Sequence, residues 1–130
     1  MPAVHKTDHA GKKLAIQAES LFLINLLLAP GLAFLLLAGL WWRHCANPSS
    51  LARNHLQQTF IVSLWAGGLL VFVNGVIILL GGYQSAATRV IVILYFTTCH
   101  AALVLLGALG LSKALAGQRY RFPLIGPAIT

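Results

Sequence analysis

Three long runs of apolar residues dominate the chain. They cover Leu21–Trp42, Phe60–Leu80 and Val90–Leu111, and none of them contains an Asp, Glu, Lys or Arg. At a rise of about 1.5 Å per residue, a helix of this length spans roughly 30 Å, the hydrocarbon thickness of a bilayer. The runs are apolar nearly all round, unlike the one-sided helices of soluble proteins. The pattern predicts an all-α integral membrane protein with three transmembrane helices.

Turn and cap residues divide these predicted spans. Gly81–Gly82 ends the second run and Arg89 precedes the third, so we expect spans two and three to form a hairpin. Pro30–Gly31 predicts a kink in the first span, Ser49–Ser50 an N-cap for the second helix and Gly117 the end of the third. The expected parts are a polar, basic N-terminal segment over 1–19, a transmembrane domain over 20–117 and a C-terminal tail over 118–130.

The ends of the spans carry residues that suit the membrane interface. Aromatic rings gather at the boundary between lipid and water, and arginines there meet anionic headgroups. The residues that fit this description, as interface or partner contacts, are Trp41, Trp42, Arg53, Arg119, Tyr120 and Arg121. Over Ser50–Thr59, the polar residues Arg53, Asn54, Gln57 and Gln58 cluster on one side, which predicts a helix that protrudes from the bilayer with this side in water.

Composition narrows the classes of function. The chain has nine Lys or Arg and only two Asp or Glu, and 8% of its residues are charged against 58% apolar. Charges this sparse exclude a disordered chain and a nucleic-acid partner. Both acids, Asp8 and Glu19, precede the first apolar run, so we expect no paired-carboxylate catalysis, no metal site and no acidic proton relay in the folded body. The chain is predicted to have no enzymatic activity, no catalytic residues and no cofactor.

Charge also bears on orientation. Three spans place the chain ends on opposite sides, with four bases on the N-terminal side and five on the other. The positive-inside rule then favours an external N-terminus and a cytoplasmic C-terminus.

A few polar and small residues lie inside the predicted spans. Asn74, Thr97 and His100 fall near the membrane midplane, and small residues accompany them on the same helix faces. Small residues let helices approach closely, and polar side chains then bond across the interface. We expect His100 to bond Asn74 or a threonine, and helix packing to involve Gly67, Asn74, Gly75, Thr97, His100 and Ala101.

His100 also allows a sharper alternative, in which it binds a haem or a quinone, because imidazole is a common axial haem ligand. His44 and His55 fall near the membrane boundary, more than about 10 Å from His100 along the membrane normal. A bis-histidine haem within one chain is therefore disfavoured, and the alternative requires another subunit.

Two segments resemble a known family. The segment Leu51-Ala52-Arg53-Asn54-His55-Leu56-Gln57 resembles its Ala-Arg-x-x-Leu-Asn motif, and Lys113 to Leu124 resembles its Lys, Gly and Tyr-Arg-Tyr-Pro-Leu ending. The family consists of short bacterial multi-span membrane proteins of unknown function, similar to the membrane component of the chloroplast inner-envelope protein translocon. The resemblance implies a helical membrane protein without an established enzymatic activity.

The function that these observations favour is that of an accessory or stabilising subunit of a larger membrane complex, acting by helix packing on other integral membrane subunits and the lipid bilayer. One alternative is a component of protein translocation or transport that acts as an oligomer. The other is an electron-transfer subunit that uses His100.

Overall fold

Every regular element that the described residues form is helical. The structure, a computed structural model, describes residues 2–44, 46, 49–123 and 126, so Met1 and the tail residues 124, 125 and 127–130 lie outside the described residues. The elements are α1 (Pro2–Leu27), α2 (Leu32–His44), α3 (Ser50–Gly67), the π-helical segment η1 (Gly68–Phe72), α4 (Val73–Gly81) and α5 (Ala86–Leu115). The predicted all-α class is confirmed over this part of the chain.

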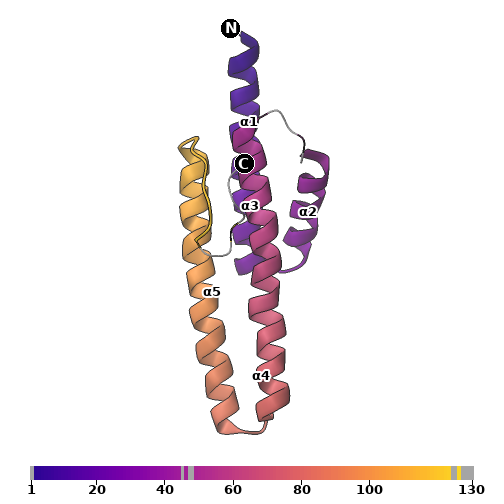
Figure 1. Ribbon diagram of the computed structural model, residues 1–130, viewed down its shortest axis with the longest axis vertical. Coiled ribbons are helices and arrows are strands. Elements are labelled where there is room, and N and C mark those ends of the chain that lie inside the picture. The colour runs from indigo at the N-terminus through magenta and orange to yellow at the C-terminus, as the bar shows by residue number, and fades with distance from the viewer. Residues whose placement is uncertain (1, 45, 47–48, 124–125, 127–130) are drawn as a thin grey trace.

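Two helical stretches are long and apolar enough to cross a membrane. One comprises α3, η1 and α4 over Ser50–Gly81, and the other is α5, Ala86–Leu115. They are joined by a short turn at one end of the molecule and run antiparallel (Figure 1). The expected hairpin of spans two and three is thus present, and two helices that could cross a membrane support membrane insertion only weakly.

The predicted caps bound these helices. The Ser49 side chain accepts a hydrogen bond from the backbone of Ala52 at 3.3 Å, as an N-cap residue does. Gly82 and Gly117 have φ values of +77° and +70°, the left-handed region in which glycine commonly ends a helix.

The first predicted span, Leu21–Trp42, is not confirmed. The run is divided between α1 and α2 by a turn at Pro30–Gly31, where Gly31 has a φ of +87° and its N–H donates to the Asn25 Oδ1 at 2.9 Å. We expected a kink in one helix at this position. Instead α2 runs back along α1, as Figure 1 shows, and the run forms a helical hairpin.

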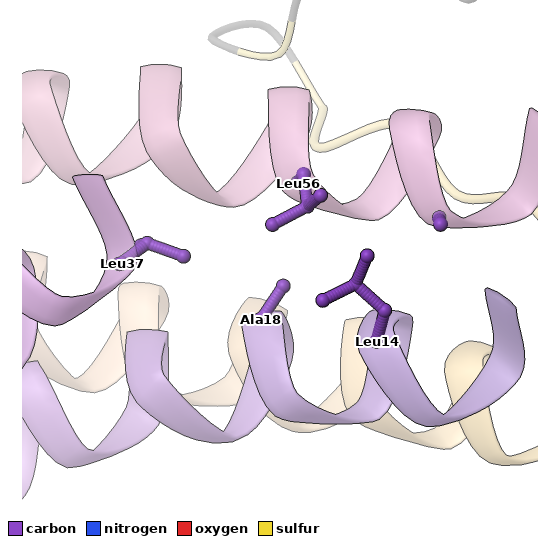
Figure 2. Packing of buried hydrophobic residues seen from close by; sticks show 5 residues of the cluster. Leu14, Ala18, Leu37 and Leu56 are labelled. Carbon is purple, nitrogen blue, oxygen red and sulfur yellow. The ribbon is translucent and has the colours of Figure 1, made fainter. Parts of the chain in front are cut away.

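A hydrophobic cluster holds this hairpin closed. It contains Leu14 and Ala18 of α1, Leu37 of α2, and Ala52 and Leu56 of α3, all of them buried. Figure 2 shows the side chains from the three helices converging. In one straight helix, Leu14 and Leu37 would be about 35 Å apart. Their presence in one cluster therefore requires that the chain reverse between α1 and α2.

A second cluster joins α1 to the long hairpin and to the tail. Phe22, Val62, Ala66 and Leu103 of α1, α3 and α5 pack with Phe122 of the C-terminal tail. The rings of Phe22 and Phe122 meet edge to face, with their centroids 5.3 Å apart. The tail thus folds back beside α1 and α3, at the end of the molecule where α3 begins.

Candidate functional site

A buried acid and a buried histidine form the most polar part of the interior. The Glu19 Oε1 on α1 lies 2.6 Å from the His55 Nδ1 on α3, and both side chains are fully buried. The other ring nitrogen, the His55 Nε2, lies 2.8 Å from the backbone carbonyl oxygen of Gln118 in the tail. The pair therefore links three segments of the chain that are far apart in sequence.

The geometry settles how many protons this pair holds. The Gln118 carbonyl can only accept a hydrogen bond, so the His55 Nε2 carries a hydrogen and donates it. One further proton then lies between the His55 Nδ1 and the Glu19 carboxyl, and the pair has no net charge wherever that proton sits. Burial raises the pKa of the Glu19 carboxyl, while the bond to His55 opposes this rise. The Glu19 Oε2 has no partner among the described residues, which favours the protonated, neutral acid.

Two amide side chains fasten the tail on the same face of α3. The backbone N–H of Tyr120 donates to the Asn54 Oδ1 at 2.8 Å, and that of Phe122 donates to the Gln58 Oε1 at 3.1 Å. Asn54 and Gln58 are one helical turn apart and meet alternate residues of an extended tail. Side chains on one face of α3 thus accept hydrogen bonds from alternate backbone N–H groups of the tail, as a neighbouring β-strand would.

These contacts contradict one expectation. We expected the polar side of Ser50–Thr59 to face water, but Asn54 and Gln58 are 6% and 1% exposed. The tail covers them; of the other two residues of the expected polar cluster, Arg53 is exposed and Gln57 is partly buried. Glu19, expected at the end of the polar N-terminal segment, is inside the fold, where α1 continues through it to Leu27.

Tyr120 is also placed differently from its expected interface position. Its backbone lies on α3, and its hydroxyl is buried without a hydrogen-bond partner among the described residues. Burial raises the pKa of the Tyr120 phenol. Its ring packs edge to face on Phe122 at a centroid distance of 5.0 Å, so Tyr120 belongs to the tail's contact with the body.

The other expected interface residues lie near the surface at this end of the molecule. Arg119 and Arg121 are exposed, and Trp42 is 79% exposed. Trp41 instead stacks on Phe60 of α3, with ring centroids 4.6 Å apart and planes 8° apart. Trp41 therefore also holds α2 against α3.

His100 lies apart from this cluster, on α5 opposite the end of α1. Its Nε2 bonds the backbone carbonyl oxygen of Leu26 at 2.9 Å, rather than Asn74 or a threonine as we expected. The Asn74 amide donates to the Leu70 carbonyl at 2.6 Å, which lies in η1 of its own helix. His100 thereby satisfies one of the carbonyls that the end of α1 leaves free.

The expected packing residues divide into two groups. Asn74 is buried, whereas Thr97 and Ala101 are exposed on α5. A Cβ added at Gly67 or Gly75 would meet nothing within 4 Å, so neither glycine makes a close helix contact within the chain. Packing of Gly67 and Gly75 against a helix of another molecule stays a prediction.

The glycines that the chain uses for its own packing are on α5. A Cβ added at Gly110 would lie 2.5 Å from the Glu19 Oε2, and one at Gly107 would lie 2.8 Å from the Phe22 ring. The expectations for site residues did not include Gly107, Gly110 or Glu19. The spacing of Ala15, Ala18 and Phe22 around Glu19 on one helical face was the available signal that this carboxyl is buried.

Among the described residues, no three His, Cys, Asp or Glu side chains gather as metal ligands would. The polar cluster at Glu19 links α1, α3 and the tail through the two contacts of His55. Comparison with known proteins adds nothing to this description, since no protein-family model, curated protein or solved structure matches the chain.

Proposed function

We propose that this chain is a small, non-enzymatic integral membrane protein that binds other membrane helices, as an accessory or stabilising subunit of a larger complex in a bacterial inner membrane. The observation that carries the proposal is the contrast between its glycines. Side chains of α1 occupy the space beside Gly107 and Gly110 of α5. The space beside Gly67, Gly68 and Gly75, on the other long helical stretch, is empty. Small residues on a membrane helix let a second helix approach closely.

The neighbours of these glycines support the same proposal. Val71 and Phe72 are 73% and 72% exposed, and Val71 is four residues from both Gly67 and Gly75. The helix thus offers alternating small and large apolar side chains, with no charged residue between Phe60 and Leu80. Such a surface suits van der Waals packing against an apolar helix of another integral membrane protein.

We further propose that the chain crosses the membrane twice, and that the α1–α2 hairpin enters and leaves on one side. The start of α1 and the described part of the tail then lie on the same side, because α5 returns to the end where α3 begins. Eight bases occupy that side, and Arg89 alone occupies the other: the eight are Lys6, Lys12, Lys13, Arg43, Arg53, Lys113, Arg119 and Arg121. The positive-inside rule places this side in the cytoplasm. This proposal replaces the expected external N-terminus.

Gly75→Leu is expected to reduce co-purification of an integral membrane partner from native membranes several-fold, because the new side chain separates the two helices. Gly67→Leu is expected to act in the same direction. The measurement is quantitative mass spectrometry of what accompanies the tagged chain, and Gly39→Leu is the matched control, since Gly39 on α2 is equally open.

Unchanged association for both Gly67→Leu and Gly75→Leu would contradict the proposed packing surface. Equal losses in the Gly39→Leu control would show that any added leucine disturbs the complex.

A further inference from the structure

A cavity of about 500 Å³ lies where the α1–α2 hairpin turns. Its walls come from the adjoining ends of α1 and α2, from α3 and η1, and from the middle of α5. Most of the lining is apolar, and the polar side chains on it are those of Asn25, Ser63 and His100. A hollow of this size with a few convergent polar groups is typical of a small-molecule site.

Glycines, which have no side chain, keep the cavity open. Gly67 and Gly68 line it, and a Cβ at either position would meet nothing within 4 Å. The cavity also borders η1, a π-helical segment within an otherwise α-helical stretch. Single π-helical turns of this kind occur frequently at functional sites.

Ser63 provides an unsatisfied polar group. Its side chain is 4% exposed, and its Oγ has no hydrogen-bond partner among the described residues. A buried hydroxyl without a partner is unfavourable, most of all at a depth that water does not reach. Because Ser63 lines the cavity, a bound molecule with a polar atom there would satisfy it.

His100 provides a hydrogen-bond acceptor. Its Nε2 faces the Leu26 carbonyl, which only accepts, so the Nε2 carries the hydrogen of the neutral ring. The Nδ1 then presents a lone pair, and no residue in the described part of the chain donates to it. The imidazole stacks on Phe96, with ring centroids 5.6 Å apart and planes 11° apart. This wall therefore combines an acceptor with an aromatic face.

The turn between α1 and α2 has to be shielded from lipid. Leu28 and Leu32 flank Pro30–Gly31 and are 79% and 64% exposed. In a membrane, non-helical backbone is tolerated where protein buries it or where it lines a cavity. Pro30 and Gly31 line this cavity, so a molecule seated there would shield the turn from lipid.

We propose that the cavity binds the head of a membrane quinol. In this proposal the quinol ring occupies the apolar hollow that Phe34 and Phe96 help to line, one hydroxyl donates to the His100 Nδ1, and Ser63 meets another oxygen. No Lys or Arg lines the cavity, so it does not suit a phosphate or carboxylate head. The apolar chain of the quinol extends through the open side of the cavity into the lipid.

The hydrogen-bond pattern makes the site selective for redox state. A quinol donates through its hydroxyls, whereas the carbonyls of a quinone only accept and leave the His100 Nδ1 without a partner. Binding is therefore tighter for the reduced form. This inference rests on the proposed membrane insertion, and it shares Gly67 and Gly68 with the proposed packing surface, whereas Gly75 belongs to that surface alone.

The test uses the full chain in lipid nanodiscs with a short-tailed ubiquinol carrying a decyl group, kept reduced under anaerobic conditions. The bound quinol is extracted and quantified against empty nanodiscs, which correct for partition into lipid. We expect saturable binding of about one quinol per chain, and roughly tenfold weaker binding of the corresponding quinone, as the loss of one hydrogen bond implies.

Two variants test the site without removing the contact between His100 and Leu26. Gly68→Leu fills the cavity and is expected to abolish saturable binding, and its φ of −60° and ψ of −48° suit a leucine. Ser63→Ala is expected to weaken binding about tenfold. Gly39→Leu and Gly75→Leu, which do not line the cavity, are expected to bind like the wild type. Circular dichroism checks the helical content of each variant.

Retention equal to that of empty nanodiscs, equal affinity for quinol and quinone, or unchanged binding in Gly68→Leu would each overturn the proposal. Loss of partner co-purification in Gly75→Leu with intact quinol binding separates the two proposals from each other.

Discussion

Replacing Glu19 with alanine is expected to reduce the free energy of unfolding by about 3 kcal/mol, because an unsatisfied buried hydrogen-bonding group costs about 1–3 kcal/mol and the void left by the side chain adds to this cost. The change leaves the buried His55 Nδ1 without its partner and opens a void where Glu19 packs against Gly110. Because His55 also holds the Gln118 carbonyl, the tail is expected to detach. Thermal unfolding in detergent measures the loss, and limited proteolysis after Arg119 or Arg121 reports the exposed tail.

Glu19→Gln is the matched control. An amide keeps the shape of the carboxyl and can donate to the His55 Nδ1 lone pair, as a protonated acid does. The neutral pair inferred from the geometry therefore predicts near-normal stability for Glu19→Gln. An alanine variant as stable as the wild type, with a protected tail, would contradict the structural role of the pair. A glutamine variant as unstable as alanine would show that the pair is ionic.

Replacing Gly110 with leucine is expected to separate α1 from α5. The first added carbon would lie 2.5 Å from the Glu19 Oε2 and 2.8 Å from its Cδ, and Glu19 is held in place by His55. Overpacking of this kind typically costs about 1–3 kcal/mol, so a clear fall in unfolding temperature is expected. The same calorimetric or spectroscopic melting experiment measures it.

Ala108→Leu is the control for Gly110→Leu, because Ala108 is exposed on the same helix two residues away. It is expected to leave the unfolding temperature nearly unchanged. Equal effects of the two changes would mean that α1 does not pack on α5 through Gly110.

Local features of the fold were predictable from the sequence. Ser49, Gly82 and Gly117 bound the long helices as expected, because each acts through backbone groups a few residues away. The long hairpin followed from the length of its apolar runs and the glycines between them. Both kinds of evidence concern segments that are contiguous in the chain.

Contacts between distant segments were not predictable in the same way. Glu19 and His55 are separated by 36 positions and His55 and Gln118 by 63, so no local pattern pairs them. Glu19 ends the polar segment before the first apolar run, so the count of charges gives no sign of its burial. Its burial depends on Gly110, whose missing side chain makes room for the carboxyl.

The first apolar run shows the limit of the length criterion. A run of 22 residues is long enough to span, but length does not reveal whether the path is straight. Pro30–Gly31 suggested a kink, whereas Asn25 caps the Gly31 N–H and the positive φ of Gly31 completes a reversal. The combination of an Asn, a Pro and a Gly within seven residues was the sequence evidence for a turn.

The central claim, two spans with a hairpin that returns to its own side, is tested most directly by labelling single cysteines. In a chain whose own Cys45 and Cys99 are replaced by serine, one cysteine is placed at Lys13, Gln84 or Arg119, all exposed positions. A thiol reagent that does not cross membranes is then added to intact spheroplasts and to lysed cells. The account predicts that only Gln84→Cys reacts in intact spheroplasts, whereas Lys13→Cys and Arg119→Cys react after lysis. Reaction of Lys13→Cys together with Gln84→Cys from outside would show three spans and contradict it.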